Sequence, residues 1–125
     1  MCLYSKTRIP KIATKDIQVY KIVLQESDKL VTPYLKHEVS KIMRTNFIEC
    51  IKGILNIFHI YNKYRISFGF IHSYETNSNA RLNCVFLSYL NPKGNYKILR
   101  GTIPKGSLYY KGSDEYCSNK LILDL

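Results

Sequence analysis

The chain has 125 residues, and its 19 Lys and Arg against 9 Asp and Glu give a formal net charge of +10 at pH 7. This length suits one domain with one core, and a hydrophobic content of 46% excludes an intrinsically disordered chain. The charge favours an anionic partner, either a nucleic acid, a nucleotide or an acidic protein surface, unless the richness in Lys, Ile, Asn and Tyr only reflects AT-rich codon usage.

Residues 1–16 are expected to form an extended arm, because Pro10 and a mixture of basic and small residues disfavour a helix. No stretch reaches the ~18 to 20 apolar residues that span a bilayer, and no apolar run follows the first basic residues. The cysteines show no zinc or redox-pair spacing; they are Cys2, Cys50, Cys84 and Cys117. We therefore expect free thiols, no metal, no cofactor, no membrane partner and a cytoplasmic setting.

The clearest strand is predicted over Ile17 to Leu24, where apolar side chains occupy both faces and Lys21 lies on the face of Val19. Residues 25–29 are polar and turn-like. An extended course resumes at residues 30–32 before Pro33, so a hairpin or a return to the sheet follows.

Apolar residues recur at intervals of three and four from Lys36 to Ile60, which predicts a helix over residues 37–51. Gly53 interrupts this pattern. The β-branched and aromatic run from Ile54 to Tyr61 fits either a continued helix or a strand.

A further strand is predicted over Arg65 to Tyr74, around Gly69, whose lack of a side chain lets another backbone or a ligand come close. The polar residues 75–78 supply N-cap candidates for a helix that runs to Leu90 and is ended by residues 91–94.

The stretch Tyr96 to Tyr110 is predicted to hold the central strand, covered on both faces, and its exit through a Pro-Lys-Gly turn. A polar connection over Asp114 to Asn119 then leads to a last strand, Lys120 to Leu125. Together these elements predict a single α+β domain with a mixed or antiparallel central sheet of five or more strands and about two helices.

This order of elements resembles the ADP-ribosyltransferase fold: a strand with Lys21, a strand ending at His72, Ser73 and Tyr74, a capped helix and a late strand after a polar turn. The resemblance implies a nicotinamide pocket between the Val19 to Lys21 strand and the His72 to Tyr74 segment.

Two departures qualify what the resemblance implies for activity. Lys21 stands where the family has an Arg or His, and Lys120 stands where a Glu-x-Glu turn places a catalytic glutamate. A cation there repels an oxocarbenium-like centre, so the expected pocket binds without turnover. Asp114 and Glu115 lie a few residues upstream and are the carboxylates that could replace the missing one.

Two short segments carry alternative interpretations. His72 beside Ser73 is either a base next to a nucleophile or an ordinary strand histidine, and neighbouring residues on a strand point to opposite faces. The turn from Pro104 to Ser107 either binds a phosphate through its backbone N–H groups and Lys105 or is a plain turn, since the Walker spacing is missing.

Aromatic and basic residues interleave near the C-terminus. Tyr109, Tyr110 and Tyr116 lie close to Lys105 and Lys111, a composition that could stack a base and neutralise a phosphate. The same tyrosines are alternatively partly buried strand residues.

The favoured function is non-catalytic binding of an anionic ligand, either a nucleotide-like small molecule or a nucleic acid. The alternatives are an interaction protein for an acidic partner and an ADP-ribosyltransferase. The short, AT-rich type of sequence also suits a viral or phage accessory protein that counters a host defence in the host cytoplasm. The candidate ligand-binding residues are Lys21, His72, Tyr74, Lys105, Tyr109, Tyr110 and Lys111.

Overall fold

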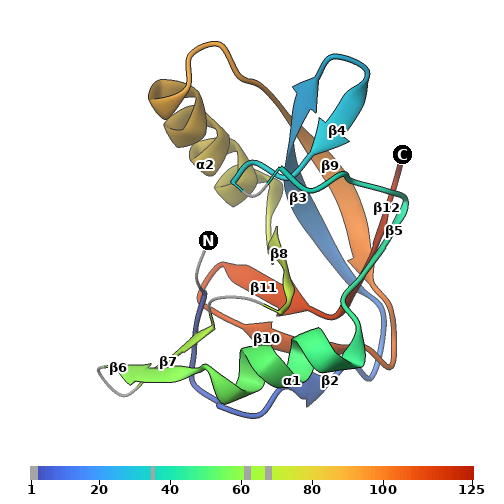
Figure 1. Cartoon of the computed structure of the whole chain (residues 1–125), viewed down its shortest axis with the longest axis vertical. Helices are drawn as coiled ribbons and strands as arrows, with labels where there is room; N and C mark the ends of the chain where they lie inside the picture. The colour runs from blue at the N-terminus through green and yellow to red at the C-terminus, as the bar shows by residue number, and fades with distance from the viewer. Residues whose placement is uncertain (1–2, 35, 61–62, 67–68) are drawn as a thin grey trace.

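The computed structural model describes residues 3–34, 36–60, 63–66 and 69–125. They form two antiparallel sheets and two helices, which confirms the predicted α+β class (Figure 1). The large sheet has nine strands: β2 (Lys11–Ile12), β3 (Ile17–Glu26), β4 (Lys29–Val31), β5 (Ile42–Arg44), β8 (Ile71–Tyr74), β9 (Asn95–Ile103), β10 (Leu108–Lys111), β11 (Glu115–Ser118) and β12 (Lys120–Leu123). The small sheet contains β1 (Leu3–Ser5), β6 (Phe58–Ile60) and β7 (Lys63–Ile66), and the helices are α1 (Phe47–Leu55) and α2 (Asn77–Leu90).

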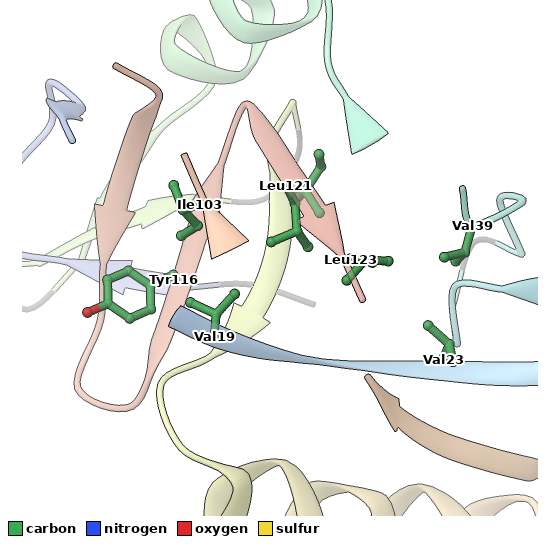
Figure 2. Packing of buried hydrophobic residues seen from close by; sticks show 8 residues of the cluster. Val19, Val23, Val39, Ile103, Tyr116, Leu121 and Leu123 are labelled. Atoms are coloured by element: carbon green, nitrogen blue, oxygen red, sulfur yellow. The ribbon is translucent and has the colours of Figure 1, made fainter. Parts of the chain in front are cut away.

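The large sheet has the strand order β2-β10-β11-β8-β3-β9-β12-β5, with β4 paired to β3 in the predicted hairpin. Strands β3 and β9 form its longest ladder, from the Ile17–Ile103 pair to the Gln25–Asn95 pair. The main core lies on one side of this ladder (Figure 2); its buried members are Val19, Val23, Val39, Ile71, Ile103, Tyr116, Leu121 and Leu123. The predicted strand over Ile17 to Leu24 is therefore confirmed.

The prediction that the central strand is covered on both faces is wrong for its first half. In β9 only Gly101 and Ile103 are buried, while Asn95, Lys97 and Arg100 are exposed. The reason is that α2 packs against the face of β9 that carries Tyr96 and Ile98, in a second core around Ala80 and Leu87. The other face gains its cover only where β9 reaches the main core.

The predicted helix over residues 37–51 is also wrong, because α1 begins at Phe47. Asn46 caps it by accepting the Glu49 N–H at 2.8 Å. The preceding residues Ile42 to Arg44 form β5, which pairs with Lys120 to Ile122 of β12. The apolar spacing that suggested one helix thus belongs to a strand followed by a shorter helix.

After α1, the ambiguous run from Ile54 contains the strand β6, and Tyr61 lies outside the described residues. The single strand predicted over Arg65 to Tyr74 is instead two strands, β7 and β8, in different sheets. Gly69 lies between them with φ of +85°, and a Cβ there would come within 2.5 Å of the Glu49 carbonyl oxygen. The predicted close approach is confirmed, and the neighbour is the backbone of α1.

The two ends of the chain are more strongly tied into sheets than the sequence suggested. The N-terminal arm is extended as predicted, but β1 pairs with β7 and β2 pairs with β10. The polar connection expected over Asp114 to Asn119 is wrong, because Glu115 to Ser118 form β11 between β10 and β8. Tyr116, Cys117 and Ser118 are buried there, so packing overrides the polar composition. Helix α2 confirms its prediction, with Thr76 accepting the Asn79 N–H.

Candidate functional site

A cleft of about 780 Å³ lies between strands β3 and β8 on one side and residues 32–34 and 37–49 on the other. Lys21, His72 and Tyr74, three of the candidate residues, line it together with Ile71 and Leu87. Its volume lies within the usual range of small-molecule sites.

Strands β3 and β8, which both line the cleft, pair with each other at only one position. Their ladder consists of the single pair Tyr20–Tyr74, whereas β8 pairs with β11 along its whole length. Where the strands separate, the Lys21 ammonium replaces the missing ladder bond and donates to the His72 carbonyl oxygen at 2.8 Å. The Lys21 side chain therefore spans the point where the sheet opens, and the residue is only 6% exposed.

Burial dominates the electrostatics of Lys21. It lowers the pKa of the Lys21 ammonium to about 8, against a smaller opposing effect of the Cys117 thiol. No carboxylate of the described residues lies within ion-pair distance of the Lys21 Nζ atom. At pH 7 such an amine is still roughly nine-tenths protonated. The cleft therefore contains a buried cation that donates a hydrogen bond to a neutral carbonyl oxygen.

His72 contacts a carboxylate that the sequence analysis did not assign to it. Its Nε2 atom lies 3.5 Å from Oε2 of Glu115, longer than a good hydrogen bond, and its ring meets Tyr74 edge to face at 4.8 Å. Burial lowers the pKa of His72, and Glu115 opposes this shift, so the imidazole is mainly neutral at pH 7. The register pair Glu115–Tyr74 produces this contact, and recognising β11 in the sequence would have revealed it.

Ser73 does not act with His72. The two residues are neighbours on β8 and their side chains point to opposite faces. The Ser73 hydroxyl is fully buried and has no hydrogen-bond partner among the described residues. The strand geometry therefore supports the ordinary strand interpretation of this pair.

The rim of the cleft carries exposed charges of both signs. The charged groups there are Arg44 and the two carboxylates Glu38 and Glu49. Because these groups are exposed, water and salt screen them strongly. The buried charge at the floor, on Lys21, is screened much less, so the floor is electropositive although the exposed rim carries more carboxylates than cations.

The turn from Pro104 to Ser107 uses its backbone donors internally. The N–H of Lys105 donates to Asp16 Oδ1, that of Gly106 to the Ala13 carbonyl and that of Ser107 to the Pro104 carbonyl, at 2.8, 2.8 and 3.1 Å. These N–H groups are therefore not available to a phosphate. Lys105 itself lies at this turn and does not line the cleft described above.

The three remaining candidates lie on β10, where alternation separates them. Tyr110 is buried in a core with Leu3 and donates its hydroxyl to the Arg8 carbonyl at 2.6 Å, so its ring offers no face to a ligand. Tyr109 and Lys111 point to the other face. There the Lys111 Nζ atom lies 5.7 Å from the Tyr116 ring centre, and the Tyr109 and Tyr116 rings are 6.0 Å apart.

The structure thus divides the seven candidates among the cleft, the turn, the core and a half-exposed aromatic surface. At that surface Lys111 already has a partner, since its Nζ atom lies 3.2 Å from Oε1 of Glu75. A second hollow, on the outer face of α2, is lined by Leu82, Asn83, Val85, Phe86 and Tyr89. It contains no charged side chain, so the first cleft is the better candidate for an anion.

The thiols of Cys50 and Cys84 are free, Cys117 is buried on β11, and Cys2 lies outside the described residues. Within the described part of the chain, no group of three or more His, Cys, Asp and Glu side chains converges as metal ligands. Neither of the helices described is long and apolar enough to cross a membrane.

Comparison with protein-family models, with curated proteins and with solved structures finds no match to this chain. The proposed function therefore follows from the residues that line the cleft.

Proposed function

We propose that this protein binds a small anionic ligand, of nucleotide size, in the cleft between β3, β8 and residues 32–34 and 37–49, without catalysing its conversion. The observation that carries the proposal is the Lys21 ammonium, buried at the floor of the cleft with no carboxylate of the described residues beside it. Burying a cation is costly unless an anion pairs with it. A phosphate or carboxylate that reaches Lys21 offsets this cost.

The other lining residues fit the same class of ligand. Tyr34 is 51% exposed at the rim and offers an aromatic surface to a flat group such as a base. Leu87 and Ile71 supply apolar surface, and neutral His72 adds no competing positive charge. A ligand with one anionic group directed inward and a larger polar or aromatic part at the rim matches this arrangement.

Catalysis is not part of the proposal. Glu115, the carboxylate nearest to His72, is not among the described residues that line the cleft. An oxocarbenium-like transition state needs negative charge close by, and the buried charge here is positive. The resemblance to ADP-ribosyltransferases stays a prediction, and it concerns binding alone.

The test is isothermal titration of the purified chain with inorganic phosphate, with adenosine monophosphate and with a short single-stranded oligonucleotide. We expect the monophosphate to bind, and Lys21→Met to weaken its binding at least about tenfold, because one charge-assisted contact is worth ~1.5 kcal/mol or more. Lys97→Met, which removes an exposed lysine from the adjacent strand β9, is the matched control and leaves binding unchanged.

Two outcomes overturn the proposal: no binding of any small anion, or equal weakening by Lys21→Met and Lys97→Met. Salt dependence separates the ligand classes, because each phosphate neutralised on a nucleic acid contributes a slope of ~0.7 to 0.9 in log K against log salt. Binding of the oligonucleotide alone, with a steep slope, would identify a nucleic-acid surface instead of the cleft.

A further inference from the structure

We propose that the ligand of the cleft carries a carbonyl group next to its anionic group, and that the Lys21 amine condenses with this carbonyl to form an imine. This inference rests on the proposed function, because it gives the anion site a second role. Both proposals concern Lys21, and this one concerns the reactivity of its amine.

Geometry is the first support. The Lys21 side chain lines the cleft, and its Nζ atom is held by one hydrogen bond to the His72 carbonyl oxygen, so the amine is fixed at the floor. A carboxylate or phosphate attracted to this cation brings a neighbouring carbonyl carbon close to the same nitrogen. Holding two reacting groups together in this way removes much of the entropic cost of their reaction.

The second support is that Lys21 can lose its proton near neutral pH, since burial lowers its pKa to about 8. At pH 8 about half of such an amine is neutral, whereas an ordinary lysine is neutral to about one part in 250, a ratio on the order of 100-fold. Neutral, desolvated lysines are the ones that form imines with carbonyl substrates. The titratable and charged groups around the cleft, among the described residues, are Tyr34, His37, Glu38, Arg44, Glu49, His72, Tyr74 and Cys117.

The step is balanced within the cleft. The ammonium first releases its proton to water, and the amine lone pair then forms the C–N bond while the carbonyl π electrons move to oxygen. A proton passes from nitrogen to that oxygen to give a neutral carbinolamine. The hydroxyl then takes back the proton that water received and leaves as water, while the nitrogen lone pair forms the C=N bond. The protonated imine is again a cation, so the anionic group of the ligand keeps its partner.

The test uses glyoxylate and pyruvate as probes on the whole chain at pH 8, with cyanoborohydride to reduce any imine to a stable secondary amine. Peptide mapping by mass spectrometry then compares the labelling of Lys21 with that of exposed lysines such as Lys97 and Lys29. We expect Lys21 to be labelled at least tenfold faster than either exposed lysine.

Lys21→Arg keeps a charge but cannot form the imine, so this variant should give no adduct at residue 21 while its surface lysines are labelled as in the natural chain. Acetaldehyde is the uncharged probe, and it should label Lys21 at least tenfold more slowly than glyoxylate does.

The inference is overturned if glyoxylate labels Lys21 no faster than Lys97, or if acetaldehyde labels it equally fast. Anion binding with no adduct on the unaltered chain refutes the imine and leaves the proposed function intact. Failure of both binding and labelling refutes the two together. The internal comparison among lysines of one folded chain remains decisive even if Lys21→Arg folds poorly.

Discussion

Lys21 and Lys111 both lie beside tyrosines on the large sheet, yet their environments have opposite effects. Lys111 is exposed and hydrogen-bonded to Glu75, which raises the pKa of the Lys111 ammonium. Lys21 is buried and donates to a carbonyl oxygen, and desolvation lowers its pKa to about 8. Lys111 has its counterion within the fold, and Lys21 lacks one among the described residues.

This difference shows why the number of basic residues says little about where an anion binds. At the Lys111 surface a ligand would have to displace Glu75 and would gain only a solvent-screened contact. In the cleft an anion meets a buried cation that has no carboxylate of the described residues within ion-pair distance. Substitutions of Lys21 and of Lys111 should therefore have different effects.

Charge reversal should separate the two lysines most strongly. Lys21→Glu places a carboxylate against the His72 carbonyl oxygen in a buried position, so we expect a loss of ~3 to 5 kcal/mol in the free energy of unfolding. Lys111→Glu, at an exposed position next to Glu75, should cost no more than about 1 kcal/mol. Urea unfolding followed by far-ultraviolet circular dichroism measures both; equal losses would contradict the contrast.

The pH dependence of stability should reveal Lys21 directly. Its pKa is about 8 when folded and 10.5 as the ordinary value, so the unfolded chain binds more protons between these values. Stability due to this group therefore rises with pH, by about 2 kcal/mol from pH 8 to pH 10. The comparison is unfolding of the natural chain against Lys21→Met over this range.

Lys111→Met is the control for that titration and should follow the natural chain to pH 10. Above that pH the buried tyrosines act in the opposite direction, because burial raises the pKa values of Tyr74 and Tyr110 and their protons are retained only in the folded state. A flat difference between the natural chain and Lys21→Met from pH 8 to 10 would show that Lys21 is not desolvated.

The smallest effect is expected at the exposed pair. Glu75→Gln removes the counterion of Lys111 and should lower the free energy of unfolding by ~0.2 to 1 kcal/mol, because exposed ion pairs contribute little. It should leave anion binding in the cleft unchanged. A large loss of binding in Glu75→Gln would place the ligand on the aromatic surface around Tyr116 instead.

Much of the fold was predictable because local patterns and packing agree. The alternation over Ile17 to Leu24 and the capped helix after Thr76 predicted β3 and α2 correctly. The helix predicted before α1 was wrong, since Ile42 and Met43 have helical spacing to later residues but pair with β12. That pairing is long-range, and a single sequence does not contain its register.

Strand register also limited how much of the candidate site could be predicted. Lys21 and His72 were selected individually and the fold places both in the cleft, but Tyr110 is a core residue because alternation on β10 turns it inward. The contact of Glu115 with His72 depends on β11, whose polar sequence resembles a loop. Residues whose role is set by strand register were the ones that sequence reasoning could not assign.

The most direct test of Lys21 as a buried anion site is the pKa of its amine. Nuclear magnetic resonance of the side-chain nitrogen or its neighbouring carbon measures this pKa. We expect a pKa near 8 in the free protein. A saturating small anion such as adenosine monophosphate should raise this pKa, because the bound charge favours the ammonium. An ordinary value near 10.5 in the free protein, or a value that the bound anion leaves unchanged, would contradict it.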